Sequence, residues 1–315
     1  MKTQTNFIAS PLNYTGGKFR LLPQIFPFFP DEVDRFVDLF CGGCNVGINV
    51  TAEKVDFYDN NISLLEIFRT FQSLGGETVV KKVEKLVKKY QLSDSKKHDY
   101  SYYHAHGSTG LGDYNREKFL HLRDDFNQKT RKDQQYYIML YTLILFSFNN
   151  QIRFNAKGEF NLPVGKRDFN KNMKEKLLKF SQKLGEENYS FTEKDFRKVD
   201  FSNLTENSFV YVDPPYLISC ATYNEQGGWR EEHERDLLLL LDSLSEKNIK
   251  FALSNSLQSK GKTNEILSAW LKENQHRYHV HHLNYHYANS NYQTKDKTKF
   301  SQEVLILNYE APVKP

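Results

Sequence analysis

The chain has 315 residues, a length that predicts one large domain or two unequal ones rather than a single small core. Its net charge of +4 and pI near 8.6 are mildly basic, which permits a polyanionic partner without requiring one. Three cysteines exclude a secreted disulfide framework, and the longest apolar stretch, 136–146, is too short to span a bilayer, so we expect a cytoplasmic protein without a signal peptide or a membrane partner.

Predicted strands and helices alternate at both ends of the chain. The expected strands are 36–40, 55–58, 208–213, 249–254 and 303–309, and the expected helices of the second half are 231–246 and 263–274. Such alternation is typical of a doubly wound α/β sheet. Between residues 73 and 189 the pattern becomes helical, charged and Tyr-rich. We therefore predict a discontinuous sheet domain, 1–72 and 190–315, with an inserted, mostly helical domain, 73–189.

The first chemical motif lies ahead of the first strand, where residues 14–18 read Tyr-Thr-Gly-Gly-Lys. The residues alone leave two interpretations open, an ordinary turn with a solvated Lys18 or a ligand contact.

The first predicted strand runs into a second motif, a turn that contains Gly42 and Gly43. Glycines there let the backbone approach a ligand, and an acidic residue about 20 positions on, here Asp59, can bind ribose hydroxyls. No G-x-G-x-x-G follows the strand, which favours a nucleoside such as S-adenosylmethionine over a dinucleotide. Cys41 and Cys44 form a C-x-x-C without a second pair or a nearby His, so we predict no metal site.

The middle of the chain holds two irregular segments. The stretch 93–114 lacks periodicity and is predicted to be a surface excursion with solvated His104 and His106. The stretch 152–162 predicts a β-hairpin, with Gly158 as its left-handed turn residue. Cationic and amide side chains adjoin this hairpin, and they are suited to contact DNA bases and phosphates. They are Asn149, Asn150, Gln151, Arg153, Lys166 and Arg167.

The most informative motif is Asp213-Pro214-Pro215-Tyr216, which directly follows the apolar run 209–212. Two prolines would end that strand, so Asp213 and Tyr216 would lie at its carboxyl end, where open α/β sheets bind ligands. Methyl transfer to a planar amino group suits this set, because the Asp213 carboxylate and the Pro214 carbonyl can accept hydrogen bonds from the NH₂ group. The Tyr216 ring can stack on a flipped base. The alternative is a purely structural role, in which the tetrapeptide is a tight turn after a strand.

Five of these blocks, in order along the chain, closely resemble the DNA adenine methylases, the Dam family of α-order amino-methyltransferases, and among them the T-even bacteriophage branch. The blocks are 14–18, 36–43, 148–155, 162–167 and 213–216. The resemblance covers nearly the whole chain except 93–114. It implies a seven-stranded, Rossmann-like methyltransferase sheet, with a target-recognition domain inserted before the catalytic motif.

The resemblance also implies site residues by position. The implied cofactor-binding residues are Tyr14, Lys18, Asp38, Phe40, Gly42, Asp59, Asp195, Phe196 and Asp213. Asp38 would face the methionine end of the cofactor, Asp59 the ribose, and Asp213 the target amine. The implied catalytic residues are Asp213, Pro214 and Tyr216. The implied DNA-binding residues are Asn149, Gln151, Arg153, Asn155, Pro163, Lys166 and Arg167.

By this resemblance the protein would methylate the exocyclic amino group of adenine in a short site of double-stranded DNA, usually GATC, by base flipping. S-adenosylmethionine would be the donor and leave as S-adenosylhomocysteine, with no metal and no obligate protein partner, in a bacterial or phage-infected cell. Asn149 and Gln151 depart from the phage branch, so the base choice can differ. The alternatives are a methylase of cytosine in DNA or guanine in RNA, a non-catalytic DNA-binding relative, and a small-molecule dehydrogenase.

Overall fold

The computed structural model describes residues 6–14, 16–186, 188–218, 228–259, 261–284 and 302–312. Thr15 of the first motif and Cys220 lie outside these ranges. Among the described residues, no helix is long and apolar enough to cross a membrane.

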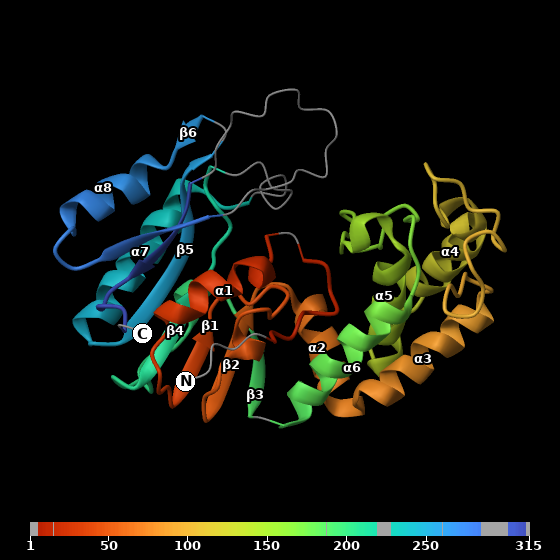
Figure 1. Ribbon diagram of the computed structural model, residues 1–315, viewed down its shortest axis with the longest axis horizontal. Coiled ribbons are helices and arrows are strands. Elements are labelled where there is room, and N and C mark those ends of the chain that lie inside the picture. The colour runs from red at the N-terminus through yellow and green to blue at the C-terminus, as the bar shows by residue number, and fades with distance from the viewer. Residues whose placement is uncertain are drawn as a thin grey trace.

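A single mixed sheet forms the centre of the fold (Figure 1). Its hydrogen-bonded order is β3-β2-β1-β4-β5-β8-β7, with β6 paired to β5. Neighbours from β3 to β5 are parallel, whereas β8 is antiparallel to both β5 and β7. The strands are β1 Arg35–Asp38, β2 Lys54–Asp59, β3 Tyr189–Glu193, β4 Ser208–Val212, β5 Lys250–Ser259, β6 Lys262–Thr263, β7 His279–Leu283 and β8 Gln302–Leu307.

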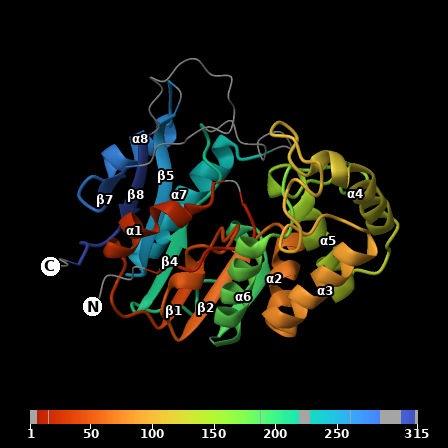
Figure 2. The same cartoon turned by 45° about the vertical axis from the view of Figure 1, so that its right-hand side comes forward.

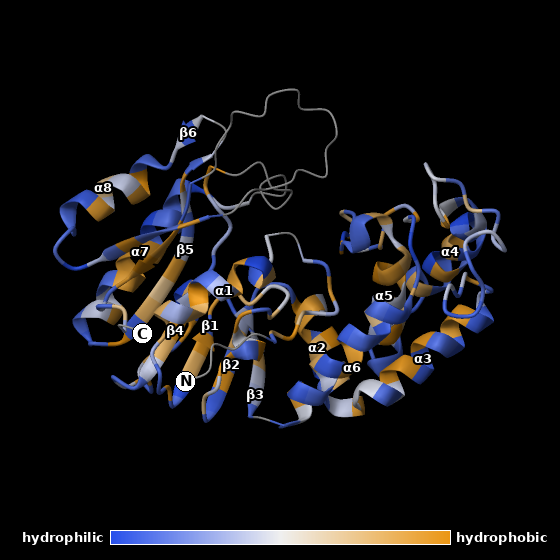
Figure 3. Cartoon of the chain, in the orientation of Figure 1, coloured by the Kyte–Doolittle hydropathy of each residue, from blue (hydrophilic) through white to orange (hydrophobic). Residues whose placement is uncertain are grey.

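The five strands predicted from the sequence are all present, because they are the apolar ones. All five residues of β4 are buried, as expected for a parallel strand that is covered on both faces (Figure 3). The sequence prediction missed β3 and β7, which lie at the two edges of the sheet. Of the five residues of β7 only Leu283 is buried, so its pattern is polar and gives no apolar strand signal.

Helices cover the sheet and extend beyond it on the β3 side (Figures 1 and 2). The α-helices are α1 Leu22–Ile25, α2 Ile62–Leu74, α3 Gly76–Lys89, α4 Gly112–Asn127, α5 Gln134–Phe146, α6 Lys171–Glu186, α7 Glu231–Glu246 and α8 Glu265–Glu273. Helices α2 to α6 come between β2 and β3 in the chain. Helix α5 is apolar all round and lies at their centre, where all residues from 136 to 146 are buried. One hydrophobic cluster joins these helices to residues of β1 and β2.

The two irregular middle segments differ from their predicted form. The expected hairpin at 152–162 is a chain reversal with a single antiparallel bridge, Phe154 to Phe160, and no regular strands. Gly158 has the expected positive φ, 77°. The predicted surface excursion is shorter than 93–114, because α4 already begins at Gly112.

Candidate active site at the carboxyl edge of the sheet

Three carboxylates mark the carboxyl ends of neighbouring parallel strands. Asp38 is the last residue of β1, Asp59 is the last residue of β2, and Asp213 directly follows β4. Since β1 lies between β2 and β4, parallel pairing brings the three strand ends to one edge of the sheet. The structure therefore places all three carboxylates at the carboxyl edge of the parallel strands.

Asp213 contacts Lys18, which is far away in the sequence, and Tyr216, which is three residues further along the chain. The Lys18 ammonium, buried at 4% exposure, lies 2.8 Å from Asp213 Oδ1 and also donates to the Gly16 carbonyl at 3.0 Å. The Tyr216 hydroxyl donates to the same carboxylate oxygen at 3.4 Å, and Lys18 Nζ lies 5.0 Å from the Tyr216 ring centroid. Lys18 is therefore not the solvated lysine of the alternative interpretation.

Burial controls the ionisation of Asp213. Desolvation raises the pKa of Asp213 to about 6, the Lys18 ammonium lowers it, and the Glu303 carboxylate raises it. At neutral pH the carboxylate is mostly ionised, and it depends on Lys18 for that state. Glu303, at 1% exposure on β8, is a contributor that the sequence analysis missed, because an acidic residue near the start of an apolar strand gives no local signal.

Asp38 organises the loop that follows β1. Its Oδ2 accepts the Gly47 amide at 3.1 Å, and Gly47 has no room for a side chain, because a Cβ would lie 2.4 Å from the Phe57 ring. Burial raises the pKa of Asp38 to about 8, the Gly47 amide lowers it, and the charges of Asp213 and Asp59 raise it. A cation bound next to Asp38 would therefore stabilise the ionised form of its carboxyl group.

Asp59 and Tyr14 fix the glycine turn. Asp59 Oδ2 accepts the Gly42 amide at 2.9 Å, and Asp59 Oδ1 accepts the Asn61 amide at 2.9 Å. Gly42 has φ +45°, and a Cβ on it would lie 2.9 Å from the Tyr14 ring. The turn therefore requires glycine for both its backbone conformation and the packing of Tyr14.

Two asparagines that sequence reasoning missed anchor residues 8–10, the segment that precedes the first motif. Asn45 Oδ1 accepts the Ser10 amide at 3.0 Å, and Asn49 exchanges two hydrogen bonds with the backbone of Ile8 at 2.7 and 2.9 Å. Both asparagines are buried, which strengthens the contacts. Asparagine is common in loops, so no sequence signal separates these anchors from solvated residues.

The cysteine pair lies buried beside the turn. Burial raises the pKa of the Cys44 thiol to about 11, which keeps it protonated. Among the residues that the structure describes, no group of three His, Cys, Asp or Glu side chains is arranged to hold a metal ion.

An aromatic cluster adjoins the end of β1. The Phe40 ring lies 5.4 Å from Phe196 and 5.6 Å from Trp229, which sequence reasoning missed. The Asp195 carboxylate accepts three hydrogen bonds from Arg197, two from the side chain and one from the backbone. These contacts lower the pKa of Asp195 to about 2. The structure thus brings Phe196 toward the site and binds Asp195 in a local ion pair.

The predicted DNA-contacting segments pack against each other. The Phe148 amide donates to the Pro163 carbonyl at 2.9 Å, and Ser147 forms an antiparallel bridge with Val164. The Asn13 side chain donates to the Asn149 carbonyl at 3.2 Å, which joins these segments to the residue before Tyr14. Both loops lie on the side of the molecule that carries the carboxyl ends of the parallel strands (Figure 1).

The side chains of these segments differ in their exposure and in their hydrogen bonds within the protein. Pro163, Lys166 and Arg167 are exposed. Arg153 is exposed but donates to the Asn161 side chain at 2.8 Å. Asn155 forms the chain reversal, because its Oδ1 accepts two backbone amides at 3.0 and 2.9 Å. His104 and His106 are exposed, as predicted.

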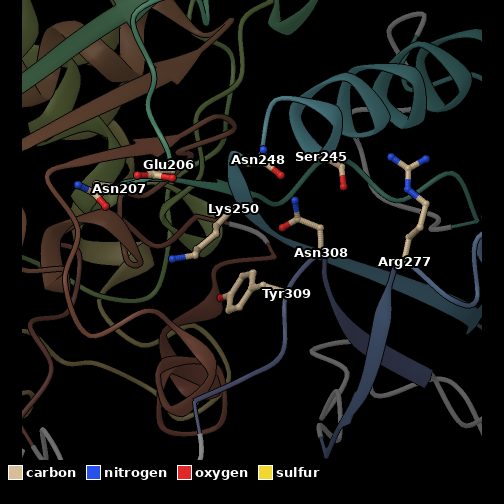
Figure 4. Close-up of a pocket in the computed structure, with 8 residues that line it drawn as sticks. All are labelled: Glu206, Asn207, Ser245, Asn248, Lys250, Arg277, Asn308 and Tyr309. Carbon is tan, nitrogen blue, oxygen red and sulfur yellow. The ribbon is translucent and has the colours of Figure 1, made fainter.

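A separate cavity of about 580 Å³ lies at the amino edge of the sheet (Figure 4). Lys250 begins β5, and Asn207 directly precedes β4, so this cavity is at the opposite end of the strands from Asp213. Its lining residues are Glu206, Asn207, Ser245, Asn248, Lys250, Arg277, Asn308 and Tyr309. None of the predicted site residues is among them.

Comparison with known proteins shows the family to which this chain is similar. The family model for D12 class N6 adenine-specific DNA methyltransferases matches residues 14–289. The chain is 42% identical to the type II methyltransferase M.FokI of Planomicrobium okeanokoites, over 98% of this chain and 44% of that protein. It is 40% identical to the modification methylase StsI of Streptococcus sanguinis, over 96% of this chain and 43% of that protein.

A third relative is shorter. The DNA adenine methylase of Haemophilus influenzae is 28% identical over 78% of each chain. The chain thus spans less than half the length of the two relatives that share 40% identity or more.

Proposed function

Because the chain belongs to the D12 class N6 adenine-specific DNA methyltransferase family, we propose that it transfers a methyl group from S-adenosylmethionine to the N6 amino group of adenine in a short duplex DNA site. The observation that carries this proposal is the largely buried Asp213 directly after β4, whose carboxylate lies 2.8 Å from the Lys18 ammonium and accepts a hydrogen bond from the Tyr216 hydroxyl.

The residues at the strand ends fit the proposed cofactor. S-adenosylmethionine, when bound, supplies a methyl group made electrophilic by a sulfonium charge. Asp38 and Asp59 are buried carboxyl groups with raised pKa values, so a cationic ligand would stabilise their ionised forms. The glycine turn under Tyr14 offers close backbone approach. We therefore assign Asp38 to the ammonium end, Asp59 to the ribose, and Tyr14, Phe40, Gly42 and Phe196 to the surrounding pocket.

The catalytic role falls to Asp213 and Pro214. A ring amino group is a weak nucleophile, because its lone pair is delocalised into the ring. Hydrogen-bond acceptors at the Asp213 carboxylate and the Pro214 carbonyl would orient the amine and stabilise the positive charge that develops on it. Lys18 keeps Asp213 ionised until the substrate arrives, and Tyr216 offers a ring face for a flipped adenine.

We assign residues 73–189 to target recognition. The proposed DNA contacts are Asn149, Gln151, Arg153, Asn155, Pro163, Lys166 and Arg167. An arginine can bind guanine with two hydrogen bonds in the major groove, and a lysine suits phosphate. GATC, the usual target that the resemblance implies, is the first candidate site.

The proposal is tested by incubating the chain with radiolabelled S-adenosylmethionine and unmethylated plasmid DNA. We expect label in N6-methyladenine after nuclease digestion, and sequencing should map it to one short motif. The Asp213→Ala variant is the matched control. Label in cytosine, label only in RNA, or no label in any nucleic acid would contradict the proposal.

A first prediction concerns the glycine turn. Gly42→Ala should weaken cofactor binding by tenfold or more, because the new Cβ would push the Tyr14 ring from its position. Gly75→Ala is the control, since Gly75 also has positive φ, +72°, but no atom within 4 Å of its Cβ position. Both variants should lose about 1 kcal/mol of stability from backbone strain. Calorimetric titration with S-adenosylhomocysteine checks this; equal affinities of the two variants would argue against the Tyr14 contact.

A second prediction follows from the raised pKa of Asp38. If the ionised form of Asp38 binds the cofactor ammonium, the pKa of Asp38 must fall on binding. Binding between about pH 6 and about pH 8 should then release protons, and the affinity should rise with pH across this range. S-adenosylhomocysteine keeps that ammonium and is a suitable probe. Titrations in two buffers of different ionisation enthalpy measure the proton release. Asp38→Asn should flatten the dependence of affinity on pH. If affinity changes with pH equally in the wild-type protein and in Asp38→Asn, the assignment is wrong.

A further inference from the structure

The excursion that precedes α4 is an ordered part of the surface, tied to the proposed DNA-contacting segment. Asp168, at 1% exposure, accepts hydrogen bonds from the Ser95 amide and hydroxyl, both at 2.7 Å, and from the Ser93 hydroxyl at 3.2 Å. Asp168 directly follows Arg167. The start of the excursion is thus fixed to the end of the segment that carries the proposed DNA contacts.

A second joint connects the other end of the excursion to the same segment. The Leu111 amide donates to the Lys166 carbonyl at 3.1 Å. Gly110 lies so close to this carbonyl that a Cβ would be 2.6 Å from the oxygen. In both ribbon views the excursion lies on the side that carries the 147–167 loop and the strand ends (Figures 1 and 2).

Two tyrosines project from this excursion. Tyr102 is 60% exposed and Tyr100 is 46% exposed. Among the described residues, the large aromatic side chains with such exposure are these two and Phe148, which belongs to the proposed DNA-contacting block. Exposed aromatic rings concentrated on two adjacent loops mark an interaction surface rather than scattered surface apolarity.

The ring of Tyr102 is held in place before any partner binds. It stacks on His98 at a centroid distance of 4.0 Å and meets the edge of Tyr103 at 5.0 Å. Tyr103 is buried, and its hydroxyl accepts the Asp94 amide at 2.9 Å. The Asp99 carboxylate accepts the Tyr102 amide at 3.0 Å. A ring fixed in this way loses little conformational entropy on binding.

The charges around the excursion favour a polyanionic partner. Lys166 and Arg167 are exposed beside the excursion, and within it the Lys97 side chain is 72% exposed and lies 3.3 Å from Asp94 Oδ2. Cationic side chains contact phosphates, while tyrosine combines ring packing against sugars and bases with a hydroxyl donor.

We propose that the excursion 93–111 is a second DNA-contacting element, in which Tyr102 and Tyr100 bind the duplex next to the site read by residues 149–167. This inference rests on the proposed DNA methylation. It extends the contact to flanking base pairs, so affinity should depend on duplex length beyond the methylated motif.

The test uses two duplexes centred on a site that the methylation assay has mapped, one with flanks of roughly ten base pairs, about one helical turn, and one with flanks of roughly two base pairs. Tyr102→Ala should weaken binding to the long duplex by roughly 5- to 30-fold, the range for truncation of an aromatic anchor, and leave binding to the short duplex unchanged. Tyr102→Phe should retain most of the affinity. Fluorescence anisotropy measures each dissociation constant.

Two further variants make the result decisive. Leu239→Ala, at an exposed apolar residue on α7, is the control and should bind both duplexes normally. Tyr100→Ala tests the second ring independently if Tyr102→Ala is poorly folded. Unchanged binding of both tyrosine variants to the long duplex, or an equal loss on both duplexes, would overturn the inference. If the wild-type protein methylates no DNA, that result would instead contradict the proposed function.

Discussion

Asp213→Ala is expected to lower kcat for adenine methylation by roughly 10³-fold, because it removes an oriented acceptor that faces developing positive charge in a site partly shielded from water. Asp213→Asn retains one acceptor oxygen but no charge, and we expect a smaller loss of roughly 10²-fold. Single-turnover rates with labelled S-adenosylmethionine measure both. The order of the two variants tests whether charge and geometry contribute separately.

The matched control is Asp200→Ala. Asp200 is exposed, and its carboxylate accepts a hydrogen bond from the nearby Ser202 amide at 2.9 Å. This variant should methylate DNA at the rate of the unchanged chain. Circular dichroism and thermal unfolding establish that the Asp213 variants are folded, since both leave Lys18 without its carboxylate partner. A folded Asp213→Ala protein with normal turnover would rule out the proposed mechanism.

The second large effect is expected at Lys18. Burial raises the pKa of Asp213 to about 6, and Lys18 opposes that rise. Lys18→Met removes the opposing charge, so the pKa of Asp213 should move above 6 and the acidic limb of kcat/KM should shift to higher pH by about one unit or more. Turnover at neutral pH should fall by tenfold or more and recover in part under alkaline conditions. Initial rates between about pH 5.5 and 9 measure the profile.

Two comparisons separate this electrostatic role from a purely structural one. Lys18→Arg retains the charge and should leave the acidic limb near its original position. In an Asp213→Asn background, Lys18→Met should cause little further loss, because there is no carboxylate left to ionise. An acidic limb that stays in place in Lys18→Met would show that Lys18 does not control the ionisation of Asp213.

Local signals were enough for much of the fold. The strands β1, β2, β4, β5 and β8 each contain a short group of apolar or aromatic residues, and such groups indicate burial wherever they occur in the chain. The edge strand β7 has the exposed, polar sequence His-Val-His-His-Leu, and it is a strand only because β8 supplies its hydrogen-bond partners. The predicted hairpin failed for a related reason, since the Asn155 side chain and one bridge close the reversal without regular strand pairing.

The candidate site was predicted in part. The sequence singled out Asp59 and Asp213 because each lies at the end of a recognisable strand, whereas Asp38 was indicated by the family resemblance. It gave no sign of Glu303 or of the asparagine anchors at 45 and 49, since isolated polar residues carry no periodic signal. Asp195 satisfied the motif, yet its carboxylate is bound to Arg197.

By itself, the sequence determined five apolar strands of the sheet and the order of motifs that identifies the family, because apolar runs, proline termination and glycine turns are local properties of the chain. Only the tertiary structure decided the state of the site. The contact between Lys18 and Asp213, the raised pKa of Asp38, and the joining of the excursion to Asp168 all depend on residues far apart in the chain. Desolvation and charge pairing arise from three-dimensional packing, and no local pattern encodes them.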